Sequence, residues 1–556
     1  MDLKERLQTV IQGEVEDDKK TLARYSRDAS LFEVQPQAVV FPKDVKDLKS
    51  LVKFVSGEKK KDYRQIYLTA RSGGSDMTGG PLGESIIVDF SRHFNGPVEV
   101  KPSFAKAAEG RGRALAEPGV FYRDFEKETL KYNLILPSFP ASREICTVGG
   151  MAANNAGGEK TLVYGKTARY VKGLKVVLSD GNEYALTPLD REALDAKLKL
   201  DNFEGEIYRR IYEIVNKNYD LLQSAKPKVH KNSAGYALWD VWNKEIFDLT
   251  QLFVGSQGTL GLITKINFEL VEPKPCSRML VIFLRDLKPL AKLVNRVLEH
   301  KPETFESYDH HTLKLAIRFI PQFVKLLKGN IVSVGWKFLP EIGMILKGGM
   351  PKLVLTAEFT GEGEEEVLAK VSQAREAVQE FRVKSRITES SAEIDKYHWI
   401  RRESFNLLRH KIKDKQTAPF IDDIIVPPDS LPEFLPKLEE IMGKYDLTYT
   451  IAGHIGEGNF HIIPLMNLSR ADAKEVIHKL TDDVYQLVFR YGGSMTAEHN
   501  DGLIRSPYLK QMYGEEVYAL FHEVKRIFDP DNIFNPGKKV GASLEYALAH
   551  LKHPRQ

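Results

Sequence analysis

The stretch of sequence that decides the fold is Thr147-Val148-Gly149-Gly150-Met151-Ala152-Ala153-Asn154-Asn155-Ala156-Gly157-Gly158. It follows Pro137-Ser138-Phe139-Pro140-Ala141-Ser142 and precedes Tyr164-Gly165, so small residues fill nearly thirty positions that hold few core-forming side chains. One explanation is a backbone that packs closely on its neighbours. The other is a long extended wall for a large flat ligand, with backbone amides and the hydroxyls of Ser138, Ser142 and Thr147 as donors.

A second glycine-rich loop lies upstream, between apolar runs that predict strands at 66–70 and 86–90. It begins Arg71-Ser72-Gly73-Gly74-Ser75, and glycine there lets several backbone N–H groups converge on an anion. By itself the loop is equally consistent with an ordinary turn. The sequence has no G-x-x-x-x-G-K-[ST] motif and no helix-opening G-x-G-x-x-G, which disfavours P-loop and Rossmann enzymes.

Length and composition limit the remaining classes. A chain of 556 residues exceeds one hydrophobic core and suggests about three to four modules. The net charge of +4 gives no support for nucleic-acid binding. Two cysteines, Cys146 and Cys276, cannot ligate an iron–sulfur cluster. Without an apolar N-terminal segment or a run of about 18 apolar residues, we expect a cytoplasmic protein, with contact at the inner membrane face left open.

The domain organisation follows from breaks in the pattern. Pro273 and Pro275 mark a boundary after a first domain at 1–272. Strands and amphipathic helices then alternate over 273–505, which predicts an α+β cap on an antiparallel sheet, and 506–556 is expected to return to the first domain. Residues 313–350 form a basic, apolar insertion, which is either an interfacial element drawn to anionic lipid or a buried part of the cap with a solvated basic face.

These motifs, together with Glu117-Pro118-Gly119 and the segment Gly255-Ser256-Gln257-Gly258-Thr259-Leu260-Gly261, carry a resemblance to a known family. The sequence resembles the FAD-linked oxidases, in the branch of D-lactate dehydrogenases, glycolate oxidase flavoprotein subunits and D-2-hydroxyglutarate dehydrogenases. The resemblance implies an α+β fold: a two-subdomain PCMH-type (vanillyl-alcohol-oxidase type) FAD-binding domain with an α+β cap. The segment Lys231 to Tyr236 resembles a family segment that lies beside the flavin.

The same resemblance implies FAD binding, with the pyrophosphate on the loop at 71–75 and the rest of the cofactor on the later glycine segments. Because this loop continues with Ser75 and Asp76 rather than a linking histidine, non-covalent FAD is implied. The implied cofactor-binding residues are Arg71, Ser72, Gly73, Gly74, Ser75, Pro137, Ser138, Ser142, Thr147, Gly149, Gly150, Ala153, Asn154, Gly157, Gly158, Tyr164, Gly165, Gly258, Thr259, Gly261 and Asn535.

A cluster of histidines in the second half suggests a metal site. His454 and His461 flank Gly456-Glu457-Gly458, and Glu498-His499 follows about forty residues later. Two imidazoles and one carboxylate can hold a divalent cation with an open position, although hydrogen-bonded structural histidines remain an alternative. The resemblance implies that His454, His461 and Glu498 bind zinc or a similar metal, and that His499 is the catalytic base.

An arginine for the substrate carboxylate is implied at Arg402, although the adjacent Arg401 could serve instead. Two departures from the family pattern leave the distal group of the substrate undefined. Ile421 stands where some relatives have lysine, and Ile463 stands where an asparagine is common.

We therefore predict an FAD-dependent dehydrogenase that oxidises a D-2-hydroxyacid of the D-lactate, D-2-hydroxyglutarate or glycolate type. The alternatives are a hydrogen-peroxide-forming oxidase of the same fold and, in a different class, a zinc hydrolase. Long family members carry a cysteine-rich iron–sulfur module after a segment resembling Glu498 to Leu509. Since no such module follows here, a separate iron–sulfur protein is expected to pass the electrons toward a quinone pool.

Overall fold

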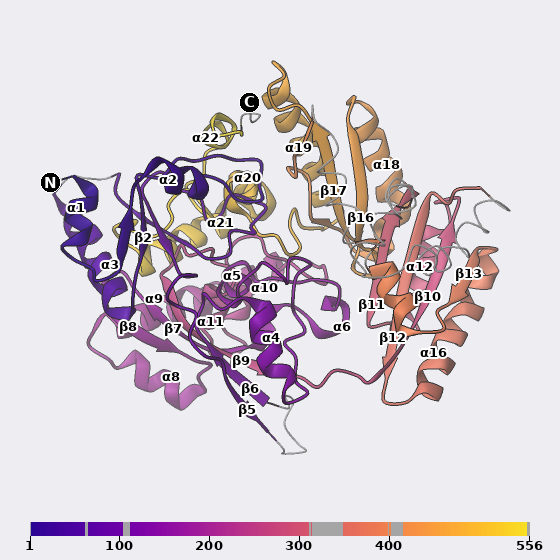
Figure 1. The fold of residues 1–556 in the computed structure, drawn as a ribbon, viewed down its shortest axis with the longest axis horizontal. Helices are drawn as coiled ribbons and strands as arrows, with labels where there is room; N and C mark the ends of the chain where they lie inside the picture. The colour runs from indigo at the N-terminus through magenta and orange to yellow at the C-terminus, as the bar shows by residue number, and fades with distance from the viewer. Residues whose placement is uncertain are drawn as a thin grey trace.

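The computed structural model describes residues 2–61, 65–103, 112–310, 313, 349–398, 400, 401 and 415–552. Figure 1 shows two parts side by side: the N-terminal half on the left and the orange cap on the right, with the yellow C-terminal helices back on the left. No helix among the described residues is long and apolar enough to cross a membrane. The predicted insertion at 313–350 lies outside the described residues except for its ends.

The first sheet of the N-terminal half is small and mostly parallel, in the order β1-β2-β4-β3. Strands β2 and β4 are buried along their whole length because both faces of the sheet are covered. Asp44 caps the following α3, whose buried face carries Leu48, Leu51, Val52 and Val55, as the helical spacing predicts. The elements are α1 (Leu3–Gln8), β1 (Glu14–Glu16), α2 (Lys19–Tyr25), β2 (Ala38–Phe41), α3 (Val45–Lys60), β3 (Leu68–Arg71) and β4 (Ile86–Asp89).

The second sheet is antiparallel, in the order β5-β6-β9-β7-β8. Strands β7 and β8 form the hairpin expected at Asp180-Gly181, where Gly181 has φ of 74°. The polar segment 188–225 is helical, as predicted. The elements are β5 (Glu99–Pro102), β6 (Gly112–Ala116), α4 (Tyr122–Leu130), α5 (Val148–Asn154), α6 (Thr161–Tyr164), α7 (Thr167–Tyr170), β7 (Val171–Val177), β8 (Glu183–Leu186), α8 (Arg191–Leu198), α9 (Phe203–Lys217), α10 (Tyr219–Ala225), α11 (Thr250–Phe253) and β9 (Leu262–Leu270).

One expected strand is shorter than the sequence suggests. The pattern from Gln251 to Glu269 predicts a continuous return to strand, but β9 begins only at Leu262. The preceding loop takes positive φ at Gly255, Gln257 and Gly258, which is incompatible with an extended strand. This loop instead faces the glycine segment at 147–158, because the N–H groups of Gly255 and Gln257 donate to carbonyls of α5.

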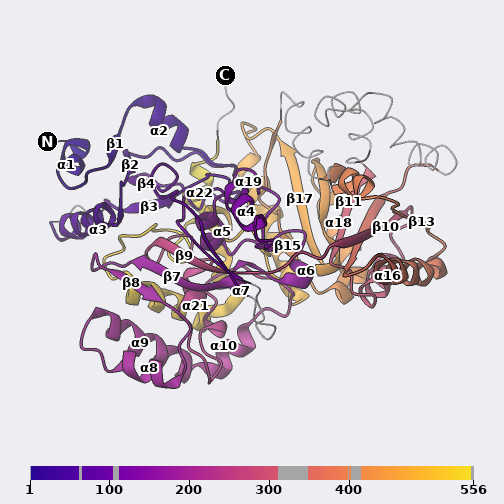
Figure 2. The same cartoon turned by 60° about the horizontal axis from the view of Figure 1, so that its bottom comes forward.

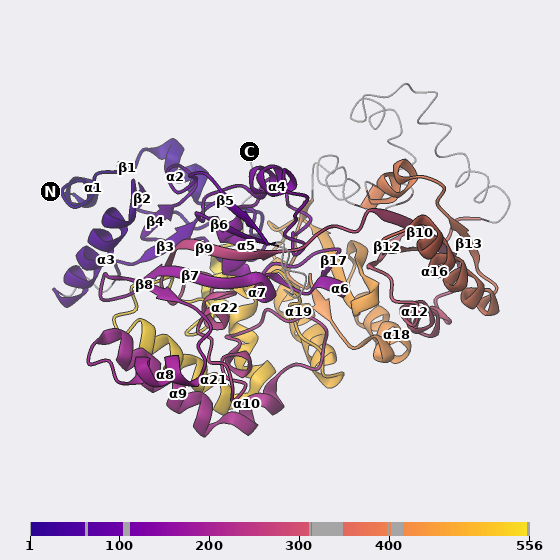
Figure 3. The same ribbon diagram turned by 90° about the horizontal axis from the view of Figure 1, so that it is seen from below.

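The cap is a single antiparallel sheet, ordered β13-β10-β12-β11-β16-β17-β14 with β15 also paired to β17. The predicted α+β cap is therefore confirmed. Its helices gather on one face of the sheet and share its hydrophobic core (Figure 3). The elements are β10 (Cys276–Leu284), α12 (Leu290–Leu298), β11 (Thr304–Asp309), β12 (Leu353–Gly361), α16 (Glu364–Ala377), β13 (Lys384–Ile387), β14 (Gln416–Thr417), β15 (Ile424–Ile425), α18 (Leu431–Gly443), β16 (Thr448–His454), β17 (Asn459–Met466) and α19 (Ala473–Arg490).

The chain after the cap returns to the N-terminal half. α20 (Gly502–Arg505) leads into α21 (Leu509–Phe528), which packs on α9 and α10 through Phe521, Val524 and Phe528. Phe534 then pairs with Leu68 in the first sheet, and α22 (Leu544–Ala549) follows. Strand β17 lies on the side of the cap sheet nearest this half (Figure 2), and its partner β16 lines the same cavity as β17 and the glycine loops.

Candidate active site

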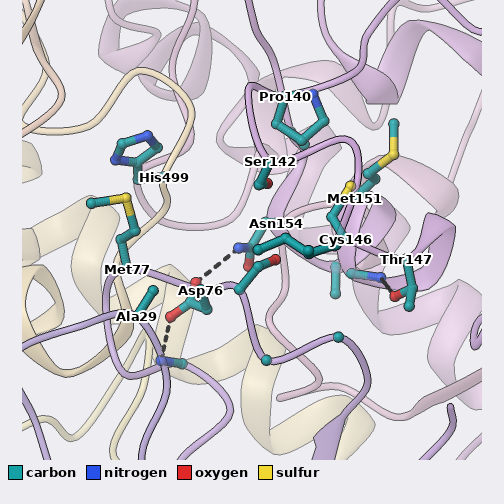
Figure 4. A pocket seen from close by; sticks show the side chains of 18 of the residues that line it. Ala29, Asp76, Met77, Pro140, Ser142, Cys146, Thr147, Met151, Asn154 and His499 are labelled. Carbon is teal, nitrogen blue, oxygen red and sulfur yellow. Dashed lines mark hydrogen bonds between the residues drawn. The ribbon is translucent and has the colours of Figure 1, made fainter. Parts of the chain in front are cut away.

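A cavity of about 580 Å³ lies between the glycine loops and strands β16 and β17. This volume is typical of sites for organic ligands. The cavity is elongated, with Thr147 toward one end and His499 toward the other in Figure 4. Of the predicted cofactor residues, thirteen line it: Arg71, Ser72, Gly73, Gly74, Ser75, Ser142, Thr147, Gly149, Gly150, Ala153, Asn154, Gly258 and Gly261.

Close approach of the loops explains the glycines in the wall. A Cβ on Gly73 would lie 2.6 Å from the carbonyl oxygen of Ile145, and one on Gly149 would lie 2.4 Å from Cβ of Pro118. Neither distance leaves room for a side chain. The glycines therefore let three segments of backbone meet around one narrow space, and the wall offers mostly backbone and small hydroxyl groups to a ligand.

Asp76 organises the first loop. Its Oδ2 accepts hydrogen bonds from the backbone N–H and hydroxyl of Thr78 and from the N–H of Gly80, each at 2.8–2.9 Å. Its Oδ1 accepts a hydrogen bond from the side-chain amide of Asn154 at 2.9 Å, and Figure 4 shows these two side chains pointing toward one another. The loop is thereby tied to α5. Sequence analysis used Asp76 only to argue against covalent attachment of FAD and did not predict this structural role.

Eight predicted cofactor residues do not line the cavity, namely Pro137, Ser138, Gly157, Gly158, Tyr164, Gly165, Thr259 and Asn535. Several of them hold the loops in place. The Ser138 hydroxyl accepts a hydrogen bond from Thr167, and Thr259 shares one with the phenol of Tyr236. The amide of Asn535 donates to the carbonyls of Gly80 and Gln257, which links two of the wall segments.

Three imidazoles converge at the cap end of the cavity. His454 ends β16 and His461 lies on β17, and the tight turn through Gly458 folds the two strands together. The Nε2 atoms of His454, His461 and His499 lie 3.2, 3.5 and 3.9 Å from one oxygen, Oε1 of Glu498. The residues that the sequence grouped from two distant motifs are thus brought to one point.

Buried carboxylates hold the opposite edge of each imidazole. Nδ1 of His454 lies 2.7 Å from Oε1 of Glu306 on β11. Asp422 serves the other two rings, with Oδ1 at 3.1 Å from Nδ1 of His461 and Oδ2 at 2.9 Å from Nδ1 of His499. The hydrogen bonds of His454 and His461 orient these two rings with Nε2 facing inward, the arrangement that orients metal-binding histidines. The contact of His499 with Asp422 is an ion pair without hydrogen-bond geometry. Neither Glu306 nor Asp422 was identified from the sequence.

Asp423 shapes the backbone that carries Glu498 and His499. It has φ of 67°, and its Oδ2 accepts hydrogen bonds from the N–H groups of Glu498 and His499 at 2.9 and 2.7 Å. The Thr496 hydroxyl donates to the same oxygen at 2.7 Å. Three donors on one oxygen make Asp423 chiefly a scaffold for this turn.

The electrostatics of the cluster favour cations. Burial opposes charge on His461, but the neighbouring carboxylates outweigh it: Asp422, together with Glu498, raises the pKa of His461 to about 10. Asp423 and Asp422 likewise raise the pKa of His499 despite its burial. For Asp422, burial is outweighed by the charges of His499 and His461, which lower its pKa. The buried carboxylates stabilise positive charge on these histidines, and a divalent cation could supply that charge in place of the protons.

The structure places the predicted metal residues close together. Ligand atoms of Asp423, His461, Glu498 and His499 lie within 4.8 Å of one another. His454 is not in that group, although its Nε2 approaches Glu498 most closely of the three rings. His454, His461 and Glu498 offer two nitrogens and an oxygen, which are suitable ligands for zinc.

An arginine also faces the cavity. Arg401 lines it, with Nη2 at 2.6 Å from Oε2 of Glu306 and 3.4 Å from Nδ1 of His454. Its Nε is buried and has no hydrogen-bond partner among the described residues. The predicted Arg402 lies outside the described residues. Of the two candidates, Arg401 is therefore the one that the described site contains.

Comparisons with known proteins agree with this geometry. Residues 36–187 match the FAD binding domain, and residues 275–539 match the C-terminal domain of FAD linked oxidases. The first match contains the loop of Arg71 and the segment at 147–158, and the second contains all four residues of the imidazole cluster. The chain therefore belongs to the FAD-linked oxidase family.

Two curated relatives illustrate the range of similarity. The D-2-hydroxyglutarate dehydrogenase of Escherichia coli (strain K12) is 27% identical over 522 residues, which cover 92% of this chain and 49% of that protein. The glycolate oxidase subunit GlcD of Bacillus subtilis (strain 168) is 26% identical over 552 residues, with coverage of 97% and 96%. The chain thus spans about half the length of four of the D-2-hydroxyglutarate dehydrogenases that it matches, but 98% of the one from Stutzerimonas stutzeri (strain A1501), at 23% identity.

Solved structures support the fold. The substrate-bound structure of p-cresol methylhydroxylase superposes with a TM-score of 0.67 and covers 96% of both chains at 15% identity. Alkyldihydroxyacetonephosphate synthase superposes with a TM-score of 0.62, covering 94% of this chain and 82% of that one at 14% identity. The predicted PCMH-type FAD-binding fold with an α+β cap is confirmed.

Proposed function

We propose that this protein is an FAD-dependent dehydrogenase that oxidises a D-2-hydroxyacid, of the D-lactate, D-2-hydroxyglutarate or glycolate type, to the corresponding 2-oxoacid. One observation carries the proposal: a cavity walled by the FAD-binding loops ends at three inward-facing imidazoles around Glu498 Oε1. Oxidation of an alcohol needs a hydride acceptor on one side of the substrate and a base on the other. FAD held by the loops would supply the acceptor, and an imidazole of the cluster would supply the base.

The cofactor fits the loops that the family assigns to it. The wall of backbone and hydroxyl groups from 71–76, 142–154 and 257–261 would hold FAD, which when bound supplies the acceptor for a hydride from the substrate carbon. Non-covalent attachment is part of the proposal, because the first loop, residues 71–80, contains neither histidine nor cysteine.

The roles at the other end follow from position. His499 is proposed as the base that takes the hydroxyl proton at Nε2, while Asp422 holds its Nδ1 edge. His454, His461 and Glu498 are proposed to hold a divalent metal, most simply zinc, which would supply a Lewis acid for the substrate oxygens. Arg401 is proposed to bind the substrate carboxylate, since its guanidinium faces the same space, and Arg402, which lies outside the described residues, stays the other candidate.

Reduced FAD would need an electron acceptor. The sequence contains two cysteines, Cys146 and Cys276, and both are free thiols. Two thiols are too few to ligate an iron–sulfur cluster. We propose a separate iron–sulfur protein as the acceptor. Affinity purification from the native cell should recover a cysteine-rich partner, whereas fast reoxidation by oxygen with no partner recovered would favour the peroxide-forming oxidase.

The direct test is anaerobic reduction of the purified yellow protein. D-2-Hydroxyacids should bleach the flavin band at about 450 nm, and their L-enantiomers should leave it unchanged. The reason is that the base and the hydride acceptor would lie on fixed sides of the substrate. The panel should include D-lactate, D-2-hydroxyglutarate and glycolate. A colourless protein that hydrolyses esters or amides would support the zinc hydrolase, and a yellow protein that no hydroxyacid reduces would refute the proposed substrate class.

A further inference from the structure

A lysine stands directly behind the proposed metal site. Lys231 lies in the loop between α10 and the turn at 238–240, and its side chain is completely buried. Its ammonium group lies 2.7 Å from Oε2 of Glu498 and 3.0 Å from Oε2 of Glu457. It thus joins the N-terminal half of the chain to two carboxylates of the second half.

The contact distinguishes the two oxygens of Glu498. Oε2 is occupied by the ammonium of Lys231, whereas Oε1 faces the Nε2 atoms of the three imidazoles. A carboxylate held in this way can offer a cation only one oxygen, in one direction. The backbone of Gly157 closes the same side, since a Cβ there would lie 3.1 Å from Oε2.

Glu457 balances the charge of Lys231. It is nearly fully buried in the turn between β16 and β17, and its other oxygen lies 2.7 Å from Nδ1 of His230, which reaches the surface. A buried ammonium would be costly beside one carboxylate that a metal also uses, because the metal withdraws negative charge from it. With Glu457 present, the lysine retains a counter-charge when Glu498 binds a cation.

We propose that Lys231 is a positioning residue that orients Glu498 for metal binding, with Glu457 as its permanent counter-charge. The inference rests on the proposed metal site and adds to it a residue outside the set of ligands. Groups that orient metal ligands typically change metal affinity by about 10- to 100-fold when they are removed.

Lys166 provides a matched control. It is another buried lysine beside the same turn, but its ammonium donates to the carbonyls of Asn232 and Ala497 and to the hydroxyl of Ser233. No carboxylate of the described residues accepts a hydrogen bond from it. Its removal should loosen the backbone locally without freeing the carboxylate of Glu498. The two lysines therefore separate the orientation of the ligand from general packing.

The experiment measures zinc binding by the full-length, FAD-loaded protein after chelation, with a chromophoric chelator as competitor. Lys231→Met should weaken zinc binding about 10- to 100-fold with unchanged FAD content, and Lys166→Met should stay within about threefold of the wild type. Because Lys231→Met leaves two buried carboxylates uncompensated and could misfold, Lys231→Met/Glu457→Gln is the second variant. It restores the charge balance and should still bind zinc weakly.

The outcomes are distinguishable. Wild-type zinc affinity in either Lys231 variant overturns the inference while leaving the metal site in place. An equal loss in Lys166→Met also overturns it, since packing would then explain the effect. Failure of the wild-type protein to bind zinc or another divalent cation overturns the metal assignment on which the inference depends, even if hydroxyacids still bleach the flavin.

Discussion

Replacement of Asp76 by alanine tests whether this carboxylate builds the first cofactor loop. Four hydrogen bonds end on its two oxygens, and two of the donors are the buried backbone N–H groups of Thr78 and Gly80. A buried donor left unpaired costs about 1–3 kcal/mol. We therefore expect Asp76→Ala to lower the free energy of unfolding by about 3 kcal/mol and Asp76→Asn, which keeps an acceptor, by about 1 kcal/mol.

The loop faces the cofactor, so FAD affinity should fall as well. Without its anchor to Asn154, the segment at 72–75 can no longer hold one shape before the ligand arrives, and we expect a loss of about 10- to 100-fold, or about 1.4–2.8 kcal/mol. Urea denaturation followed by circular dichroism measures stability, and quenching of flavin fluorescence during titration of the FAD-free protein measures affinity.

A neighbouring acid serves as the control. Glu84 is half exposed and makes one ion pair with His550 at 3.2 Å, so Glu84→Ala should change stability by less than about 0.5 kcal/mol and leave FAD affinity unchanged. The reasoning is refuted if Asp76→Ala keeps wild-type FAD affinity, or if Glu84→Ala produces the same loss. A stable Asp76→Ala with weak FAD binding would show that water replaces the lost acceptor in the fold but not in the site.

Three further predictions concern the cofactor, the base and pH. Denaturation should release FAD into the supernatant, and yellow colour retained on the precipitated chain would contradict non-covalent binding. His499→Ala should lower turnover by about 10²- to 10⁴-fold with an intact flavin spectrum, and near-normal turnover would remove His499 as the base. Burial and the charge of Asp76 raise the pKa of Asp28 to about 7, so its ionisation costs stability as pH rises from about 4 to 7. Asp28→Asn removes this cost, so its stability relative to the wild type should be about 2–3 kcal/mol greater at pH 8 than at pH 5. A pH-independent difference in unfolding free energy would contradict this.

Functional positions could be predicted from the sequence where the residue type is unusual for its sequence surroundings. Small residues over 137–165 predicted a wall because a core would need larger side chains there. Gly149 and Gly150 do line the cavity, whereas Gly157, Gly158 and Gly165 lie outside it. His454 and His461 were grouped correctly in space because the Gly-x-Gly turn between them allows adjacent antiparallel strands. The antiparallel cap was predictable from alternating strands and amphipathic helices.

The sequence did not predict the groups that orient the site. Glu306 and Asp422 lie far along the chain from the histidines that they hold, and an acid on a strand is usually solvated. One signal was available: Asp422-Asp423 stands between the apolar residues Phe420-Ile421 and Ile424-Ile425, which are fully buried here. Two buried carboxylates need hydrogen-bond donors or cationic groups beside them, and clusters of buried ionisable groups are typical of functional sites.

The contacts of Asn535 make the order of synthesis matter for cofactor loading. Its side chain bridges the carbonyls of Gly80 and Gln257, which are 455 and 278 residues earlier in the chain. Lys525 and Lys538 likewise bind the carbonyls of Thr259 and Leu82. A nascent chain on the ribosome holds both halves of the cofactor wall long before the residue that joins them emerges. We therefore expect FAD to bind late in biogenesis. The cap, whose sequence lies between Leu68 and Phe534 of the first sheet, would fold before the chain returns to that sheet.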